Sequence, residues 1–529
     1  MSTSSRPSTR PQPSASTPQT PRWRSALAGV LALAAGLAAA ELVAGALARG
    51  TTPFVAVGET FIDMTPGWLK DFAIEWFGTA DKAVLLGGMA VVLVALGVGV
   101  GVLSERRPGA GHLAALALLA VAGIAVWSRP DTTGADLIPV GAAGVVALPA
   151  LSWLVGLSRQ VDQPTAQTPA SSPEATSRRA FLTAATAAAA FAVTGTGVGR
   201  WLASRRVGVE SSREELAASI DLPTPDVPAS VDLGVDGAEP WRTPNADFYR
   251  IDTALSEPLI HPADWTLRIH GMVEREVEID YDALIEMGLV DRWLTLNCVS
   301  NEVGGGLIGN ALWTGVPIAD VLALARPLPD ADAVLSTSDD GWNAGTPLEA
   351  LTDGRDALLA VGMNGEPLPL EHGFPVRMIV PGLYGYVSAT KWVVDLEVSR
   401  FDAFEAYWTT RGWAERGPVK VASRIDVPAS GDDVTAGTVA VAGVAWAQHR
   451  GIERVEVRVD DGSWQPARLA DVPSADTWRQ WIYEWDAEPG DHTLQVRAVT
   501  ADGEVQTSEQ APPAPNGSSG RHGIDVHVT

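Results

Sequence analysis

The chain carries long apolar stretches in its first 206 residues and short alternating ones after them. Five apolar runs occupy residues 25–48, 83–104, 111–127, 137–158 and 180–199, and Glu41 is the one charged side chain that they contain. Runs of about 20 apolar residues can cross the hydrocarbon core of a bilayer. Five of them in succession do not fit buried helices of a soluble protein. The pattern therefore predicts a membrane region over residues 22–200 with about five transmembrane helices.

Arginines beside the apolar runs predict the orientation of the chain. They precede the first run, follow the second, and lie between the fourth and the fifth: Arg22, Arg24, Arg106, Arg107, Arg159, Arg178 and Arg179. Short loops rich in Lys and Arg remain in the cytoplasm. Residues after 200 are then extracytoplasmic, in a multi-pass protein of the cell membrane. Arg200, Arg205 and Arg206 oppose this orientation, but the four-loop pattern favours it.

Three shorter segments of this region have their own interpretations. Residues 1–21, rich in Ser, Thr and Pro, predict a disordered tail. Residues 68–77 place aromatic side chains at helical spacing opposite charged ones, which indicates an interfacial amphipathic helix or a partner-docking helix. Residues 177–182, SRRAFL, resemble the twin-arginine export pattern, although Thr183 stands where Lys is usual. Paired arginines also serve as topology determinants, so export is expected only if the following domain folds around a cofactor first.

The remaining chain divides into a linker and two predicted domains. Residues 201–240 are polar, contain Pro223 and Pro228, and read as a linker. Residues 241–415 mix short β-like runs (266–269, 377–380, 392–398) with helical segments (281–287, 318–324), which is typical of an α+β domain. Residues 416–529 show alternating strands with hairpin turns at Asp461-Gly462 and Asp502-Gly503, which predicts a β-sandwich.

Charge and composition exclude several classes of protein. The formal net charge is −25; residues 1–206 carry 16 basic and 11 acidic side chains, and residues 207–529 carry 22 and 52. Such an acidic second part excludes nucleic acid as a partner, because nucleic acid requires basic surfaces. An apolar content of 46% excludes a wholly disordered chain. With Cys298 as the single cysteine, no intrachain disulfide can form.

Cys298 ends an apolar run and precedes Gly304-Gly305-Gly306. A lone cysteine is most often a small buried apolar residue. A zinc site would need histidines, and the nearest, His270 and His372, are scattered. A Cys-His nucleophile pair has no local sequence signature here. A thiolate can also complete the shell of a soft metal whose other ligands come from a cofactor. The residues alone leave these alternatives open.

Several motifs resemble the sulfite oxidase family of molybdenum enzymes. Residues 363–377, MNGEPLPLEHGFPVR, and 380–392, VPGLYGYVSATKW, resemble its pterin-binding stretch. Residues 243–250, with TPN and FYR, and residues 313–317, WTGVP, resemble further motifs of the same domain. Residues 444–446, VAW, and the hairpin before Trp464 resemble the family's immunoglobulin-like dimerisation domain. The resemblance covers residues 241–529 and implies an α+β molybdopterin domain followed by an Ig-like β-sandwich, both beyond the α-helical membrane region.

The resemblance also implies a cofactor and its contacts. The cofactor would be molybdenum–molybdopterin, with Cys298 as the protein ligand of the metal. Arg377 would offer a fork and Lys391 a point charge to the cofactor phosphate. The full set of cofactor-binding residues is Asn245, Tyr249, Arg250, Cys298, Asp339, His372, Arg377, Ser388, Ala389, Thr390 and Lys391. Cys298 and Arg250 are the expected catalytic residues, in a two-electron oxo transfer.

Departures from the family pattern bear on the substrate. Asn301 is followed by Glu302 where the family has arginines, the first strand reads Arg250-Ile251-Asp252, and Glu405 replaces an expected tyrosine. An acidic environment opposes binding of a dianion. Reduction of a neutral sulfoxide or N-oxide is therefore favoured over sulfite-type oxidation. A third alternative is a non-catalytic, membrane-tethered binding or adhesion protein.

Electrons require a partner. The apolar runs contain only His112, so two haem ligands are not available from them, and no haem is expected on this chain. The expected electron partner is an external carrier or a membrane haem or quinone-linked protein. A homodimer formed through the C-terminal domain is also expected.

Overall fold

The computed structural model describes residues 23–47, 52–65, 76, 81–129, 132–162, 173–220, 222–223, 226–255 and 257–529. The predicted tail at 1–21 lies outside these residues, and so does the amphipathic helix at 68–77 apart from Trp76. The chain forms two compact units: Met1–Gly58 with Lys82–Ser128 and Thr132–Ala203, and Glu59–Asp81 with Arg129–Asp131 and Ser204–Thr529.

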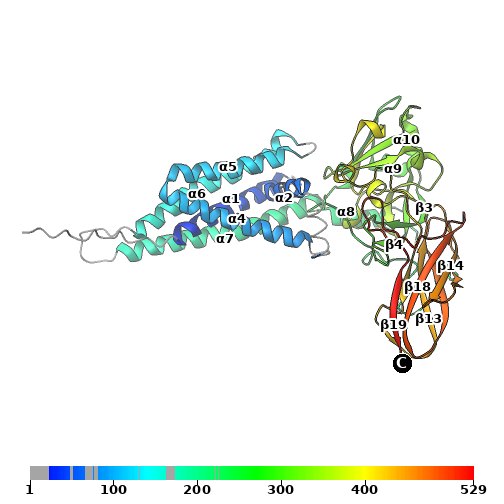
Figure 1. Cartoon of the computed structure of the whole chain (residues 1–529). Coiled ribbons are helices and arrows are strands. Elements are labelled where there is room, and N and C mark those ends of the chain that lie inside the picture. The colour runs from blue at the N-terminus through cyan, green and yellow to red at the C-terminus, as the bar shows by residue number, and fades with distance from the viewer. Residues whose placement is uncertain are drawn as a thin grey trace, which may run out of the picture. The chain divides into compact units, whose positions relative to one another are not determined.

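The first unit is helical, as predicted. Its helices are α1 (Trp23–Leu47), α4 (Asp81–Arg106), α5 (Pro108–Trp127), α6 (Ile138–Asp162) and α7 (Pro173–Val207), with α2 (Pro53–Met64) shared between the units (Figure 1). Among the described residues, five helical segments are long and apolar enough to span a membrane. Small residues allow close packing, because a Cβ on Gly29 of α1 would collide with the backbone of Gly97 and Gly101 of α4.

Two sheets and three short helices form the α+β part of the second unit. One sheet has the strand order β2-β1-β10-β5-β6, and the other β3-β4-β7-β8 with β9 paired to β7. The bounds are β1 Thr266–Gly271, β2 Val277–Asp280, α9 Tyr281–Glu286, β3 Val290–Asn297, β4 Ile308–Pro317, α10 Ile318–Ala325, β5 Ala333–Ser338, β6 Asn343–Pro347, α11 Leu348–Thr352, β7 Leu358–Met363, β8 Glu366–Pro367, β9 Arg377–Ile379 and β10 Val393–Ser399. The predicted strands and helices are confirmed. Strand β4 is buried along nearly its whole length, so its sheet is covered on both faces.

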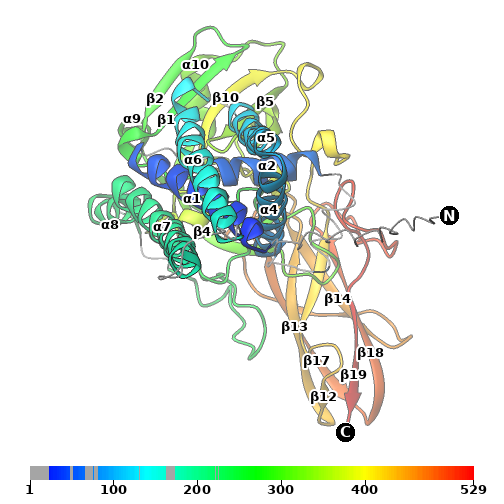
Figure 2. The ribbon, with the colours of Figure 1, turned by 90° about the vertical axis from the view of Figure 1, so that its left-hand side faces the viewer.

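The C-terminal part is a β-sandwich, as predicted (Figure 2). One sheet contains β11 (Ala422–Val427), β13 (Gly437–Trp446), β17 (Arg479–Ala487) and β16 (Arg468–Leu469), in this order. The other contains β12 (Asp433–Val434), β19 (Gly523–Val528), β18 (Gly490–Thr500), β14 (Ile452–Val459) and β15 (Gln465–Pro466). Buried side chains of both sheets, including Val441, Trp481, Val457 and Leu494, share one core.

The predicted linker differs from the structure. Within residues 201–240, α7 continues to Val207 and a further helix, α8, spans Val209–Ser219. Val209 packs in a cluster with Phe248 and Trp313, and Arg213 Nε donates to the carbonyl oxygen of Leu368 at 3.0 Å. Helix α8 is short and polar, so its sequence shows little period, and tertiary contacts stabilise it.

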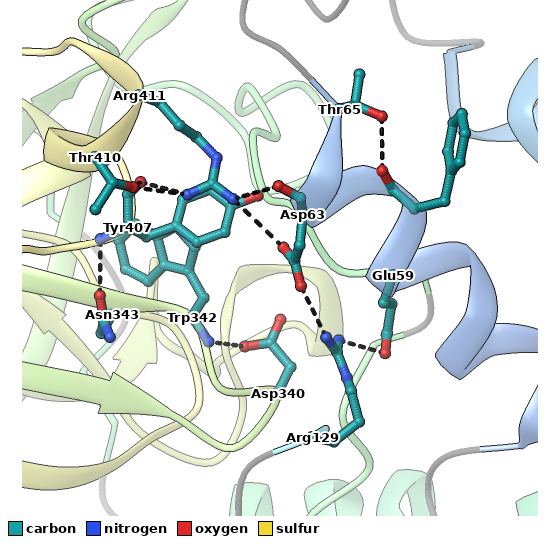
Figure 3. A network of polar contacts seen from close by, with 11 residues as sticks. Glu59, Asp63, Thr65, Arg129, Asp340, Trp342, Asn343, Tyr407, Thr410 and Arg411 are labelled. Atoms are coloured by element: carbon teal, nitrogen blue, oxygen red, sulfur yellow. Dashed lines mark hydrogen bonds and ion pairs between the residues drawn. The ribbon is translucent and has the colours of Figure 1, made fainter. Parts of the chain in front are cut away.

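A polar network in the second unit connects segments that are far apart in sequence (Figure 3). Arg129 forms ion pairs with Glu59 at 2.5 Å and with Asp63 at 3.0 Å. Arg411 donates to the carbonyl oxygen of Asp63 at 3.1 Å, and its guanidinium lies 3.6 Å from the ring centroid of Tyr407. Residues 59–63 are thereby attached to residues 407–411.

Candidate cofactor site

The turn containing η4 (Leu370–His372) lies against residues 385–392, which begin with η5 (Gly385–Val387) and precede β10, because a Cβ on Gly373 would contact the backbone of Lys391 at 3.1 Å. Residues 385–392 also lie beside the end of β3, which directly precedes Cys298. A Cβ on Gly385 would contact the side chain of Ala389 at 3.7 Å and the carbonyl oxygen of Asn297 at 3.8 Å. The predicted pterin-binding stretch is therefore adjacent to the cysteine strand.

Cys298 is a buried free thiol, 8% exposed. Its N–H donates to the carbonyl oxygen of Leu307 at 3.0 Å, and its carbonyl oxygen accepts from the N–H of Asn301 at 3.1 Å. Burial raises the pKa of the thiol, and hydrogen bonds from Ser300 oppose this only in part. The protonated thiol is therefore favoured until a metal displaces the proton.

Arg377 is a buried cation, 2% exposed, and no carboxylate of the described residues lies within ion-pair distance of it. Its Nη1 donates to the carbonyl oxygen of His372 at 3.0 Å, Nη2 to that of Ala389 at 3.5 Å, and Nε has no partner. The guanidinium carbon lies 5.1 Å from the ring centroid of Trp313. Burial lowers the pKa of Arg377 to about 10. A buried cation in this state is suited to an anionic ligand.

Lys391 is also buried but has a counter-ion. Its Nζ donates to Asp252 at 2.9 Å and to the carbonyl oxygen of Glu371 at 2.8 Å. Burial lowers the pKa of Lys391 to about 8, although Asp252 opposes the shift. Because of this ion pair, Lys391 would attract an anionic ligand less strongly than the resemblance implies.

His372 lies between these cations and Asn245. Its Nε2 is 3.4 Å from the carbonyl oxygen of Asn245, and its ring meets Phe248 edge-on with centroids 5.6 Å apart. Burial lowers the pKa of His372 to about 3, and the positive charges of Arg377 and Lys391 add to the shift. The imidazole is neutral at physiological pH.

Asn245 and Tyr249 are half-buried residues of the same region. Asn245 donates to the carbonyl oxygen of Met363 at 3.2 Å and accepts from Asn364 at 2.8 Å. Burial raises the pKa of Tyr249 well above its usual range; Cys298 adds to the shift and Arg377 opposes it. Tyr249 therefore interacts electrostatically with both the thiol and the guanidinium.

Other predicted site residues are engaged elsewhere. Arg250 lies at the surface, 39% exposed, and pairs with Asp252 at 3.0 Å and Glu257 at 2.8 Å. Asp339 is exposed, and its N–H donates to the carbonyl oxygen of Trp392 at 2.9 Å. Neither side chain is brought to the thiol by an observed contact.

The hydroxyl groups of Ser388 and Thr390 bond within the protein. Ser388 Oγ donates to the carbonyl oxygen of Tyr384 at 2.9 Å, and Thr390 Oγ1 lies 2.6 Å from Ser336 Oγ. Both residues are fully buried. They shape the turn that holds Ala389 rather than present free hydroxyls.

Buried polar atoms without partners mark the same region. Within the described part of the chain they include Asn297 Oδ1, Ser338 Oγ, Arg377 Nε and Trp392 Nε1. Asn297 precedes the cysteine, Trp392 follows Lys391, and Ser338 is the register partner of Val393 in the β5–β10 pair. Native proteins satisfy nearly all buried polar groups, so this set fits a polar ligand such as a pterin.

Sequence reasoning did not select Asn297, Ser338, Trp392 or Asp252. Trp392 ends the motif at 380–392 and Asn297 directly precedes Cys298, but only burial reveals their unsatisfied atoms. Among the described residues, no group of three or more His, Cys, Asp or Glu side chains could hold a metal ion. A metal bound by Cys298 would take its other ligands from the cofactor.

Comparisons with known proteins support a molybdopterin-binding oxidoreductase domain in this part of the chain. Residues 254–408 match the oxidoreductase molybdopterin binding domain, and residues 422–496 match the bacterial Ig domain. Human mitochondrial sulfite oxidase is 29% identical over 323 residues, covering 52% of this chain and 59% of the human protein. The uncharacterized oxidoreductase YuiH of Bacillus subtilis is 28% identical over 171 residues, covering 31% and 83%.

Among solved structures, the sulfane dehydrogenase SoxCD from Paracoccus pantotrophus aligns with a TM-score of 0.48 and 24% identity, covering 55% of this chain and 84% of that chain. The chain spans less than two thirds of the length of the sulfite oxidase from human that it matches. Residues 254–408 thus carry an oxidoreductase molybdopterin binding domain, and the chain is similar to the sulfite oxidase family of molybdopterin oxidoreductases.

Proposed function

We propose that the chain is a molybdenum–molybdopterin oxidoreductase that catalyses two-electron oxo transfer. The observation that carries the proposal is the buried Arg377, a cation with an unsatisfied Nε and without a carboxylate partner among the described residues, in the same region as the thiol of Cys298. An organic cofactor with a phosphate and a thiolate-bound metal would satisfy both groups. When bound, molybdenum would supply the two-electron redox chemistry.

Each residue of the site would have a separate role in binding the cofactor. Cys298 would bind the metal after losing its proton. Arg377, held by the carbonyl oxygens of His372 and Ala389, would receive the phosphate through its unsatisfied face. The neutral imidazole of His372 would exchange a hydrogen bond with the pterin without adding charge, and Asn245 would fix the adjacent backbone.

The charge pattern supports a neutral substrate. Asp252 pairs with both Arg250 and Lys391, and Glu302 is exposed in the loop that follows Cys298. A site whose outer cations are already paired attracts a dianion weakly. We therefore propose a sulfoxide or N-oxide, reduced with two electrons and two protons to the thioether or amine and water. Sulfite-type oxidation is the second candidate, because the human relative is a sulfite oxidase.

The helices of the first unit support a membrane anchor. With the arginine-rich loops in the cytoplasm, the catalytic part would face the extracytoplasmic side. Electrons would come from a membrane quinol or haem protein, and the Ig-like part would form a homodimer.

Metal analysis tests the proposed function. The full chain, purified in detergent from cells supplied with molybdate, should contain about one molybdenum and one pterin per chain, and Cys298→Ser should lose the metal because its thiolate ligand is gone. No molybdenum in the wild-type chain would instead favour the membrane-tethered binding or adhesion protein.

An assay panel tests the substrate. Sulfite, nitrate, sulfoxides and N-oxides would be compared with artificial electron donors and acceptors. We expect sulfoxides or N-oxides to give the highest kcat/KM. Faster turnover of sulfite than of every neutral oxide would contradict this substrate class.

A further inference from the structure

The loop that carries Cys298 has little stiffness of its own. It connects β3 to β4 over residues 298–307 and contains Gly304, Gly305 and Gly306. Internal hydrogen bonds hold its base: Asn301 Oδ1 accepts from the N–H of Leu307 at 2.8 Å, and the N–H of Gly305 donates to the carbonyl oxygen of Glu302 at 3.0 Å. Glycines permit many backbone conformations, so the rest of the loop needs outside contacts to keep one.

The β-sandwich supplies those contacts from two separate segments. Arg424 of β11 donates from Nη1 to the carbonyl oxygen of Gly305 at 3.0 Å. Ser518, before β19, donates from Oγ to the carbonyl oxygen of Asn301 at 2.6 Å. The imidazole of His522 packs on Gly304, where a Cβ would collide with the ring. Each of these contacts is made to a loop residue that lies within eight positions of Cys298 in the sequence.

The two larger contacting side chains are themselves fixed. Arg424 forms ion pairs with Asp426 at 2.5 Å and Glu239 at 3.3 Å, and its side chain is only 8% exposed. His522 Nδ1 accepts from the N–H of Ile425 at 3.0 Å. Burial and the charge of Arg424 lower the pKa of His522, so the ring stays neutral against the loop.

The sandwich also holds the strand on the other side of the thiol. Thr295 of β3 donates from its N–H to the carbonyl oxygen of Asp476 at 2.9 Å, and its Oγ1 accepts from the N–H of Trp478 at 2.8 Å. Gln448 Nε2 donates to the carbonyl oxygen of Thr295 at 3.2 Å. Cys298 thus lies between two backbone segments that the β-sandwich fixes.

We propose that Arg424, Ser518 and His522 are positioning residues for the Cys298 thiol, which makes the β-sandwich part of the metal site as well as a folding unit. The proposal rests on the proposed function only where it makes this thiol a metal ligand. The control of the thiol by the sandwich is a property of the protein without cofactor.

The unique cysteine allows a direct test. The full chain, purified in detergent from cells grown without molybdate, would be labelled with a thiol-reactive disulfide reagent, and the rate would report how often the loop opens. Arg424→Gln should label about tenfold faster, because a charged hydrogen bond to the loop is lost, and Ser518→Ala about threefold faster. Arg424→Lys, which keeps a charged donor, should restore a rate close to wild type.

Arg454→Gln is the matched control, since Arg454 is an exposed arginine of the same β-sandwich that pairs with Glu456 at 3.2 Å. It should label at the wild-type rate. Wild-type rates in both Arg424→Gln and Ser518→Ala would overturn the proposal, and so would equal acceleration in Arg454→Gln. If Arg424→Gln fails to unfold cooperatively on heating, the labelling rate of Ser518→Ala alone tests the proposal.

A spectroscopic measurement separates positioning from general loosening. In chains loaded with molybdenum, Ser518→Ala should change the g values of the Mo(V) electron paramagnetic resonance signal, whereas Arg454→Gln should not. Unchanged g values in Ser518→Ala would overturn the link to the metal. A wild-type chain without molybdenum would defeat the proposed function and leave the labelling result standing.

Discussion

At the scale of single residues, the two buried cations of the site differ in what surrounds them. Lys391 has Asp252 at 2.9 Å, whereas Arg377 bonds only to backbone carbonyl oxygens and keeps an unsatisfied Nε. A buried charge without a counter-ion destabilises the folded chain. Arg377 therefore destabilises the folded chain in the absence of an anionic ligand, and under the proposed function it would contribute binding energy to the cofactor.

Substitution of Arg377 tests this role. Arg377→Met should lower the pterin content of the purified chain at least about tenfold, because a charge-assisted contact is lost. The same change should leave the Tm of the cofactor-free chain equal or raise it. Arg377→Lys keeps the charge without the fork and should retain an intermediate content. Wild-type pterin content in Arg377→Met would exclude Arg377 as the phosphate partner.

His372 predicts an acid dependence of stability. Burial lowers its folded-state pKa to about 3 from an ordinary value of 6.5, so the unfolded chain binds the proton first as the pH falls. The contribution of neutral His372 to the free energy of unfolding is complete above pH 6.5 and decreases as the pH falls towards 3. At pH 5 this contribution has decreased by about 2 kcal/mol.

The measurement compares His372→Gln with the wild type, both cofactor-free, by thermal unfolding at pH 7.5 and pH 5. His372→Gln should show the smaller decrease in Tm on acidification, since it lacks the titrating ring. His261→Gln serves as control and should decrease as the wild type does. Equal decreases in all three chains would contradict the argument.

At the scale of elements, α8 stabilises the α+β part from outside its sheets. Arg213 donates from Nε to the carbonyl oxygens of Pro367 and Leu368, at 3.2 and 3.0 Å, just before the turn that contains His372. Val209 of the same helix packs in the cluster that includes Phe248 and Trp313. The helix thus contacts the N-terminal part of residues 363–377, the stretch that we propose binds the pterin.

Arg213→Ala should therefore destabilise the second unit by about 1–3 kcal/mol, because buried carbonyl oxygens lose their donor. Thermal unfolding of the full chain, followed by tryptophan fluorescence, measures the change. Glu215→Ala, at an exposed position of α8, is the matched control and should leave the Tm unchanged. An equal Tm in the two variants would show that α8 is only a connecting segment and does not stabilise the second unit.

At the scale of the whole molecule, the acidic residues 207–529 follow a basic region whose described residues include five helices long and apolar enough to span a membrane. If the domain is extracytoplasmic, as proposed, and folds around its cofactor before export, it would cross the membrane folded. The arginines at 178 and 179 precede most of the last candidate span. We predict that these arginines direct export of a folded domain.

A double substitution tests the export prediction. Arg178→Lys together with Arg179→Lys keeps the positive charge that sets topology and removes the guanidinium pair of the export pattern. A reporter active only outside the cytoplasm, fused after Thr529, should lose activity in the double variant. Arg106→Lys with Arg107→Lys is the control and should retain it. Full activity in the 178/179 variant would show that the pair serves topology alone.

Patterns that are local in the chain were determined by the sequence itself. Apolar runs identify the helices of the first unit, alternation identifies the sandwich strands, and the motifs at residues 243–250, 313–317 and 363–392 carry the resemblance to the sulfite oxidase family. Each of these patterns depends on residues that are close to one another in the sequence.

Only the tertiary structure decided how the charges of the site are paired. Asp252 neutralises Lys391 from 139 residues away, and Arg424 reaches the loop of Cys298 from 119 residues away at Gly305. Arg377, identified from its motif, has no carboxylate partner among the described residues. Ion pairing and burial depend on distances that folding sets between remote segments, and residue order alone does not contain them.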